Sequence, residues 1–369
     1  MIKAERSYWE SELYGRKFDL IVLGAGLTGQ SIAHFYKKGN PDKKVLVVDR
    51  GFYPIGASTR NAGFACFGSV TEHMADMEIE EEAKIIDRIR RRIHGLGLLR
   101  KTLGDENIGY REPGAYEIFT DAGVYEQALE NLDVCNRWLR EAAGLEDVYQ
   151  KCEHNGFPAI SIKQEGCLHP GKMMRTLYEK NLAAGVEFRW QSKVQKIEQD
   201  DGVLLLENGI ELQGQQLAVA TNSFTSTLLE DIDIRPGRGF VFVTKPIPNL
   251  KWKGTYHFDR GYYYFRGVQG DRFLLGGARS LDIDVETTTE FGTNQKIKKS
   301  LLSFANDVLR LPEGWEIDTE WSGIMGFTST KSPMLQRINN KTIVVAGLSG
   351  MGVALGMQLG KEAAHLVIK

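Results

Sequence analysis

Short apolar runs alternate with glycine-rich turns near the start of the chain. Residues 17–23 form one such run and predict a buried strand, and the residues after Gly24 predict a helix to about residue 36. A second run, residues 44–49, predicts another strand and ends in a carboxylate, Asp49. The order of strand, tight turn, helix and strand is the order that a dinucleotide site requires.

The turn between the first strand and the helix carries three glycines in the spacing Gly24-x-Gly26-x-x-Gly29. Gly24 permits the turn, Gly26 lets backbone approach a pyrophosphate, and Gly29 lets the helix pack closely on the strand. Asp49 can accept hydrogen bonds from an adenosine ribose and would repel a 2′-phosphate. These features predict a dinucleotide site, the alternative being an ordinary glycine-rich turn.

The pattern farther along the chain predicts segments that interrupt this unit and then return to it. Residues 77–103 are dense in Glu, Lys and Arg and predict an amphipathic helix, whose run from Arg88 to Arg92 is expected on a solvated or salt-bridged face. Alternating residues predict a hairpin of strands 261–266 and 272–277. We expect further helices over 123–143, 171–184 and 294–309, further strands over 115–120, 193–198, 203–207, 215–222 and 341–347, and a last helix ending near 367.

Composition and charge limit the classes of function. The 369 residues suffice for about two domains, and a net charge of −2 gives no bias toward nucleic acid. The four cysteines, Cys66, Cys135, Cys152 and Cys167, have no metal-ligand spacing and are expected to be reduced thiols. Residues 1–16 are charged and lack an apolar signal core, and no apolar run reaches the ~18 residues of a membrane span. We therefore expect a cytoplasmic protein.

A second glycine-rich helix start, Gly347 to Gly352, lies far from the first. A nicotinamide enzyme has no use for it. A flavin ring gains negative charge along its N1 and O2 edge on reduction, and a helix N-terminus stabilises that charge. Flavin is therefore favoured over nicotinamide as the cofactor.

With these features together, the sequence resembles the FAD-dependent D-amino acid oxidase superfamily, in the branch of glycine and sarcosine oxidases and γ-glutamylputrescine oxidase. The resemblance covers nearly the whole chain. It rests on ordered blocks, which are the first glycine turn, Asp49-Arg50, Gly56 to Gly63, Val194, Ala220-Thr221-Asn222, Trp321-Ser322-Gly323 and Gly347 to Gly352.

The resemblance implies an α/β fold, with a glutathione-reductase-like FAD-binding Rossmann domain and a second, mostly antiparallel α+β substrate domain. The FAD-binding domain is expected over residues 1–75, 155–230 and 325–369, and the substrate domain over 76–154 and 231–324. No cysteine follows Cys167, so the C-terminal cysteinyl flavin link is impossible and FAD is expected to be non-covalent.

The resemblance also implies a set of FAD contacts. The first glycine turn would hold the pyrophosphate, Asp49 and Arg50 the ribose side of AMP, residues 57–63 the flavin, Val194 the adenine, and the last turn the pyrimidine edge of the ring. The expected cofactor residues are Gly24, Gly26, Leu27, Thr28, Gly29, Asp49, Arg50, Ala57, Ser58, Thr59, Asn61, Ala62, Gly63, Val194, Ala220, Thr221, Asn222, Leu348, Ser349, Gly350, Met351 and Gly352.

Four residues are implied at the reacting end of the ring. Arg60 would lie near flavin N5, and Tyr262, Tyr264 and Arg266 would face the cavity above the flavin, although either arginine could instead be structural and the strand's cavity-facing side depends on its register. The family reaction moves a hydride from a C–H beside an amine nitrogen to flavin N5, and the imine then hydrolyses. The partners implied are a small amine or amino acid and oxygen or another electron acceptor.

Departures from the family leave the substrate open. Met325 stands where the glycine-oxidase branch has a carboxylate-binding Arg, and Ala354 where the sarcosine-oxidase branch has a carboxylate-binding Lys. A larger amine, or another anchor such as Arg238, Arg279 or Lys331, is therefore considered. The alternatives to amine oxidation are an FAD-dependent 2-hydroxyacid dehydrogenase, a nicotinamide reductase and a flavin-binding protein without turnover.

Overall fold

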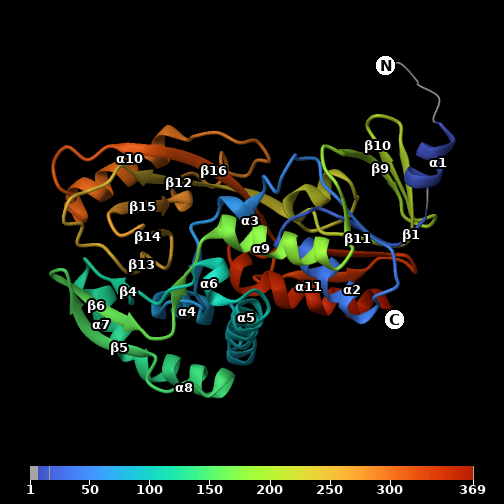
Figure 1. The fold of residues 1–369 in the computed structure, drawn as a ribbon. Helices are drawn as coiled ribbons and strands as arrows, with labels where there is room; N and C mark the ends of the chain where they lie inside the picture. The colour runs from blue at the N-terminus through green and yellow to red at the C-terminus, as the bar shows by residue number, and fades with distance from the viewer. Residues whose placement is uncertain (1–6, 16, 369) are drawn as a thin grey trace.

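Two eight-stranded sheets organise the part of the chain that the computed structural model describes, residues 7–15 and 17–368 (Figure 1). The segment 1–16, in which no signal core is expected, lies partly outside these residues. The first sheet has the order β17-β18-β11-β1-β2-β8, and β10 and β9 extend from β11. Its strands are β1 Phe18–Leu23, β2 Val45–Val48, β8 Glu187–Arg189, β9 Val194–Glu198, β10 Val203–Leu206, β11 Glu211–Val219, β17 Met334–Arg337 and β18 Thr342–Ala346.

The centre of the first sheet is parallel, with β1 between β2 and β11, and β18 on the far side of β11. Residues of β2 and β18 are buried throughout, which explains why these strands are continuous apolar runs without alternation. The predicted first unit is thus confirmed, with helix α2 Leu27–Gly39 following β1 and helix α11 Gly352–Ile368 following β18.

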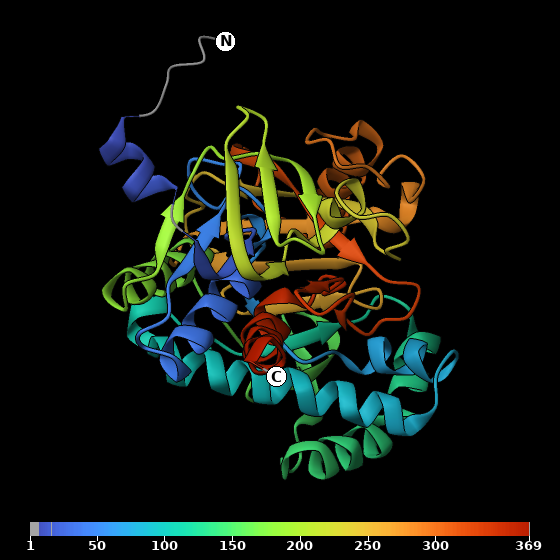
Figure 2. The same ribbon diagram turned by 90° about the vertical axis from the view of Figure 1, so that its right-hand side faces the viewer.

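Helix α11 packs between α2 and the long helix α5 Glu82–Leu103 (Figure 2). Small residues allow the close contacts. A Cβ at Gly95 of α5 would lie 1.9 Å from the Ala354 carbonyl oxygen, and one at Gly360 would lie 2.4 Å from the Ser31 Cβ atom. The last helix can therefore pack closely against α5 on one side and α2 on the other, because a glycine lies at each contact.

The second sheet has the order β16-β12-β15-β14-β13-β4-β6-β5 and is antiparallel except for the pair β13 and β4. Its strands are β4 Ala115–Ile118, β5 Tyr149–His154, β6 Phe157–Ile162, β12 Arg235–Thr244, β13 Thr255–Phe258, β14 Tyr263–Val268, β15 Arg272–Gly277 and β16 Ile317–Phe327. The second segment of the FAD-binding domain is expected to begin at residue 155, which lies within the β5–β6 hairpin. The chain leaves the second sheet only after Ile162.

The remaining elements connect or cover the two sheets. The helix expected over 77–103 begins only at Glu82, and a separate helix before it ends at Met77; Ser69 caps that helix, whose Glu72 amide donates to the Ser69 hydroxyl. The helix over 123–143 is divided at Asn131. These elements are α1 Tyr8–Tyr14, α3 Ala57–Arg60, β3 Phe64–Ala65, α4 Val70–Met77, α6 Asp105–Ile108, α7 Ala122–Glu130, α8 Leu132–Ala143, β7 Gly166–Cys167, α9 Pro170–Ala183, η1 Asn222–Thr227, η2 Arg279–Asp282, α10 Gln295–Ser303 and the π-helical turn η3 Phe304–Val308. No helix among the described residues is long and apolar enough to span a membrane.

Candidate functional site

A cavity of about 580 Å³ lies between the two sheets. One wall comes from the turns that follow β1, β2, β11 and β18, and the other from strands β12 to β16 of the second sheet. The carboxyl ends of parallel strands meet at one edge of a sheet, so turns far apart in the sequence line the same cavity.

The first glycine turn is built for close approach of backbone. Gly24 has φ +106°, and a Cβ there would lie 2.6 Å from the Ala220 carbonyl oxygen. A Cβ at Gly29 would lie 1.9 Å from the Gly24 carbonyl oxygen. Gly24, Gly26, Leu27 and Thr28 line the cavity, whereas Gly29 lies behind them and sets the distance between α2 and the turn.

Asp49 fixes this turn from the end of β2. Its carboxylate accepts hydrogen bonds from the Ala25 amide at 2.7 Å and the Gly51 amide at 2.8 Å. Burial raises the pKa of the Asp49 carboxyl, and the two backbone hydrogen bonds oppose that shift. Arg50 also lines the cavity, with its guanidinium 3.7 Å from the centroid of the Phe224 ring.

The small polar segment 57–63 forms helix α3 and the turn after it. The Asn61 side chain donates to the carbonyls of Ala57 and Ser58 and accepts the Gly63 amide, so one amide side chain shapes the whole turn. The expected residues of this segment line the cavity except Thr59, whose hydroxyl donates to the Pro54 carbonyl instead.

The late glycine turn reaches the same cavity. Gly347, Ser349 and Gly350 all have positive φ, and α11 begins at Gly352. The Gly347 amide donates to the Asn222 side chain at 3.1 Å, and the Ser349 amide donates to the Gly326 carbonyl at 3.0 Å. Asn222 itself has φ +52°, as a residue that tolerates left-handed backbone can. The lining residues of these turns include Val194, Ala220, Thr221, Asn222, Leu348, Ser349, Gly350, Met351 and Gly352.

Three of the four residues expected at the reacting end line the cavity. Arg60 does so while donating to the carbonyls of Ile55 and Ser322, each at 2.9 Å. Tyr262 and Tyr264 face the cavity, whereas Tyr263 points into the core, where its hydroxyl meets Ser300 at 2.9 Å. The register of β14 therefore settles which face of that strand the cavity sees.

Arg266 does not line the cavity, contrary to the expectation from the sequence. It is buried and donates to the carbonyls of Ala62 at 2.6 Å and Leu168 at 3.1 Å. Arg266 therefore connects the second sheet to the segment 57–63. Its position along β14 places its Cβ atom on the same face as Tyr264, but its side chain is long enough to carry the guanidinium away from the cavity to these carbonyls.

A group of buried charged residues at the cavity wall was not expected from the sequence. Arg92 donates to the Glu72 carboxylate at 2.7 Å and to the Phe67 carbonyl at 3.0 Å. Burial raises the pKa of Glu72, but the charge and hydrogen bond of Arg92, together with the charges of His73 and His257, lower the pKa to about 2. Both side chains line the cavity. The Arg88–Arg92 run is salt-bridged as expected, but two of its members point inward, because residues four apart share a helix face.

His257 lines the cavity beside them, with its Nε2 atom 2.9 Å from the Glu165 carboxylate. Burial lowers the pKa of His257, but the charge of Glu165 and its hydrogen bond, with Glu117 and Glu72 beyond, raise it to about 9. The imidazole is therefore protonated at neutral pH. No local spacing in the sequence links residues 72, 165 and 257, so only the fold could reveal this cluster.

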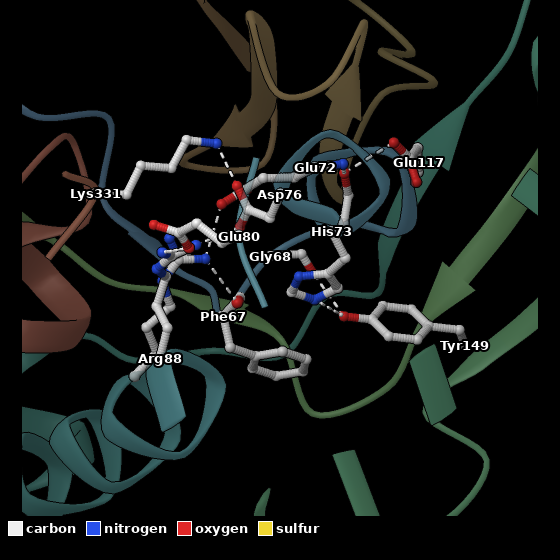
Figure 3. A network of polar contacts seen from close by, with 12 residues as sticks. Phe67, Gly68, Glu72, His73, Asp76, Glu80, Arg88, Glu117, Tyr149 and Lys331 are labelled. Atoms are coloured by element: carbon white, nitrogen blue, oxygen red, sulfur yellow. Dashed lines mark hydrogen bonds and ion pairs between the residues drawn. The ribbon is translucent and has the colours of Figure 1, made fainter. Parts of the chain in front are cut away.

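Figure 3 shows the neighbouring part of the same polar network. The Asp76 carboxylate accepts from Arg88 and from Lys331, and Arg88 also contacts Glu80. Lys331 belongs to the loop between β16 and β17 and lines the cavity, so this contact holds the loop against α4. Among the described residues no group of His, Cys, Asp and Glu side chains has a geometry that could hold a metal ion.

A cleft lined by two glycine-bounded helix starts, and by a polar wall from a second sheet, is typical of a protein that binds an extended dinucleotide for redox chemistry. The chain belongs to the DAO family, described as FAD dependent oxidoreductases, whose family model matches residues 19–366. FAD is therefore the cofactor, and the resemblance seen in the sequence is confirmed.

Individual relatives are distant in sequence but similar in length. The D-amino acid dehydrogenase of Helicobacter pylori is 21% identical over 404 residues, with 95% of each chain covered. The glycine oxidase of Geobacillus kaustophilus has a TM-score of 0.75 at 20% identity, and the iminodiacetate oxidase of Chelativorans sp. BNC1 has 0.77 at 16%, each with 95% of both chains covered. The two structures share the fold.

Proposed function

We propose that this protein oxidises the C–N bond of an amine or amino acid with non-covalent FAD. The observation that carries the proposal is the cavity itself, because turns at both ends of the chain and a polar wall of the second sheet line one continuous space. The similar proteins are named for glycine, iminodiacetate and D-amino acids, compounds that share an amine nitrogen and a carboxylate.

The residues present fit FAD at both ends. The glycine turn with Gly24 and Gly26 leaves room for a pyrophosphate beside the α2 N-terminus, and side chains there would meet backbone or Ser58. In the proposal the turn before α11, with Gly350 and Gly352, holds the pyrimidine edge of the ring. The bound cofactor supplies the hydride acceptor, and the imine formed from the substrate hydrolyses.

The residues of the second wall then position the amine and exclude water. Tyr264 lies over Gly276, where a Cβ would come 2.6 Å from its ring, and burial raises the pKa of its hydroxyl to about 12. Tyr264 is therefore a neutral hydrogen-bond donor at any working pH. Arg60, held by two backbone carbonyls, presents a fixed positive charge where the ring's reactive edge is proposed to lie.

The test is anaerobic reduction of the purified holoprotein. Glycine, D- and L-amino acids, iminodiacetate, simple amines and 2-hydroxyacids are added separately, and the visible flavin band and the release of ammonia are followed. We expect an amine-bearing compound to bleach the flavin, and its imine then hydrolyses to release ammonia from a primary amine or glycine from iminodiacetate. Bleaching by 2-hydroxyacids alone would establish the dehydrogenase alternative. Bleaching by dithionite but by no member of the panel would favour a flavin-binding protein without turnover.

Two finer points stay predictions. The electron acceptor is oxygen or another oxidant, and Leu274 stands near the place of the oxygen-activating Lys of sarcosine oxidases. Comparing reoxidation of the reduced protein in air with reoxidation by a quinone distinguishes these acceptors. The cytoplasmic location expected from the sequence is tested by fractionating cells that produce the protein.

A further inference from the structure

Arg279 differs from the other positively charged residues of the cavity wall. Its Nε atom is buried, and among the described residues its guanidinium has no hydrogen-bond or ion-pair partner. Its guanidinium lies over the Phe327 ring, whose centroid is 4.6 Å from the Arg279 Cζ atom. Arg279 as a whole is half-buried, but a charged group that is partly withdrawn from water without a hydrogen-bond acceptor is costly, so its place in a cavity indicates a missing anionic partner.

The other cations of the wall are either already engaged or exposed to solvent. Arg92 pairs with Glu72, Lys331 with Asp76 and His257 with Glu165, and Arg60 donates to two carbonyls. The side chains of Arg50, Lys193 and Arg260 are exposed.

Burial lowers the pKa of Arg279 and the charge of the Glu286 carboxylate opposes that shift, but this carboxylate is not available to it as a partner. Glu286 is buried, and Arg238 donates to both of its oxygens at 2.9 Å. The Asn294 side chain donates to the same carboxylate at 3.0 Å. Glu286 and Arg238 therefore neutralise one another, and Arg238 does not line the cavity.

Neighbouring residues hold the Arg279 guanidinium in place. Gly237 makes room for the stacked pair, since a Cβ there would lie 2.4 Å from the Phe327 ring and 3.0 Å from the Arg279 Cζ atom. Met325, two residues before Phe327 on β16, lines the cavity, so the stacked pair and Met325 share one face of that strand. Stacking fixes the plane of the guanidinium while its edge stays free for a planar acid.

We propose that Arg279 binds the carboxylate of the substrate through its guanidinium edge, so that the substrate is an amino acid or another amine that carries a carboxylate. The amine half of this statement rests on the proposed function, and the carboxylate half rests on Arg279 alone. A bidentate contact between a planar guanidinium and a carboxylate supplies two parallel charge-assisted hydrogen bonds. It also fixes the orientation of the carbon atom between the acid and the amine.

The test measures binding rather than turnover. Benzoate and acetate are titrated into the oxidised holoprotein, and the shift of the visible flavin spectrum and the heat of binding give the Kd. We expect Arg279→Met to raise the Kd roughly 30-fold or more, because one partner of a partly desolvated charge pair is removed. Arg279→Lys keeps the positive charge but loses the planar, two-pronged guanidinium. Its Kd should lie between those of the unchanged protein and Arg279→Met.

Arg260→Met is the matched control, since it removes an exposed cation from the same cavity wall. Its Kd for benzoate should stay near that of the unchanged protein. Flavin content and melting temperature show that each variant is folded. An unchanged Kd in folded Arg279→Met, an equal loss in Arg260→Met, or no carboxylate binding by the unchanged protein would overturn the assignment.

A second measurement connects the anchor to the substrate. Anaerobic flavin reduction by an amino acid is compared with reduction by the amine that lacks its carboxylate, and Arg279→Met should abolish the preference for the acid. Equal preference in both proteins would contradict the proposal. If no amine reduces the flavin, the proposed function fails, while the benzoate titration still decides whether Arg279 binds an acid.

Discussion

Replacing Gly29 by alanine tests how the first glycine turn holds the cofactor. The Cβ of Gly29→Ala would lie 1.9 Å from the Gly24 carbonyl oxygen, 3.1 Å from the Gly24 carbonyl carbon and 3.3 Å from the Val22 Cγ1 atom. Cβ contacts shorter than 3.0 Å are essentially absent from real proteins. Helix α2 must therefore move away from the turn by at least about 1.1 Å, the difference between 3.0 and 1.9 Å.

The cost of this movement falls on cofactor binding. A shift of about 1 Å would withdraw the amides at the start of α2 from the position proposed for the pyrophosphate, and hydrogen bonds to a charged group contribute about 1.5–3 kcal/mol each. Loss of two such bonds weakens FAD binding by at least about 3 kcal/mol, or roughly 100-fold in Kd. Alanine's better helix propensity, worth about 1 kcal/mol, does not offset this loss.

Gly39→Ala is the matched control, because Gly39 ends the same helix and its added Cβ would meet nothing within 4 Å. Each variant is stripped of flavin, and FAD binding is followed by quenching of flavin fluorescence, with thermal melts before and after FAD is added. We expect weak FAD binding for Gly29→Ala and native binding for Gly39→Ala. Native FAD affinity in Gly29→Ala would refute the argument that this glycine sets the distance between helix and turn.

Two further variants test the buried charges at the cavity wall. Arg92→Met leaves the Glu72 carboxylate without its partner and should lower the free energy of unfolding by about 3 kcal/mol. Arg91→Met breaks a half-exposed pair with Glu362 and should lower it by about 1 kcal/mol or less. Equal losses for the two variants in urea unfolding would contradict this. His257 has a pKa raised from 6.5 to about 9, so its protonated form contributes stability that is complete below about pH 6.5 and is lost as the pH rises through 9. This contribution is about 3 kcal/mol, and His257→Asn should remove the decline between these pH values; parallel pH profiles for the two proteins would be inconsistent with a stabilising pair between His257 and Glu165.

Local sequence signals predicted the elements that bind the dinucleotide. The strand before Gly24, the helix after it, and the strand ending at Asp49 all depend on hydrophobic runs and glycine positions that lie close together in the chain. The convergence of the first and last glycine turns was also predictable, because a flavin needs helix starts at both of its ends. The helix expected over 171–184 begins at Pro170, and the side chain of His169 just before it accepts the Lys172 amide.

The cavity wall from the second sheet was harder to predict. Arg266 alternates with Tyr264 along β14 and was expected to face the cavity, but its long side chain reaches two backbone carbonyls behind it. Glu72, Arg92 and His257 come from α4, α5 and β13, and nothing in their spacing indicates that they meet. Side-chain length and tertiary contacts decide these positions, and neither leaves a periodic signal.

The structure also separates the three anchors that the sequence left open. Arg238 and Lys331 have carboxylate partners, Glu286 and Asp76, and only Arg279 of the three combines a place on the cavity wall with a guanidinium that has no partner among the described residues. Sequence could nominate these residues because each carries the right charge. The contacts leave Arg279 as the residue that we propose for the substrate.

A crystal structure of the holoprotein tests most directly whether one FAD spans both glycine turns. We predict that its pyrophosphate lies against Gly24 to Gly29 and that the N1 and O2 edge of its ring lies within hydrogen-bond reach of the amides of residues 350–352. A ring bound away from residues 350–352, or a nucleotide that occupies only the first turn, would contradict the central claim.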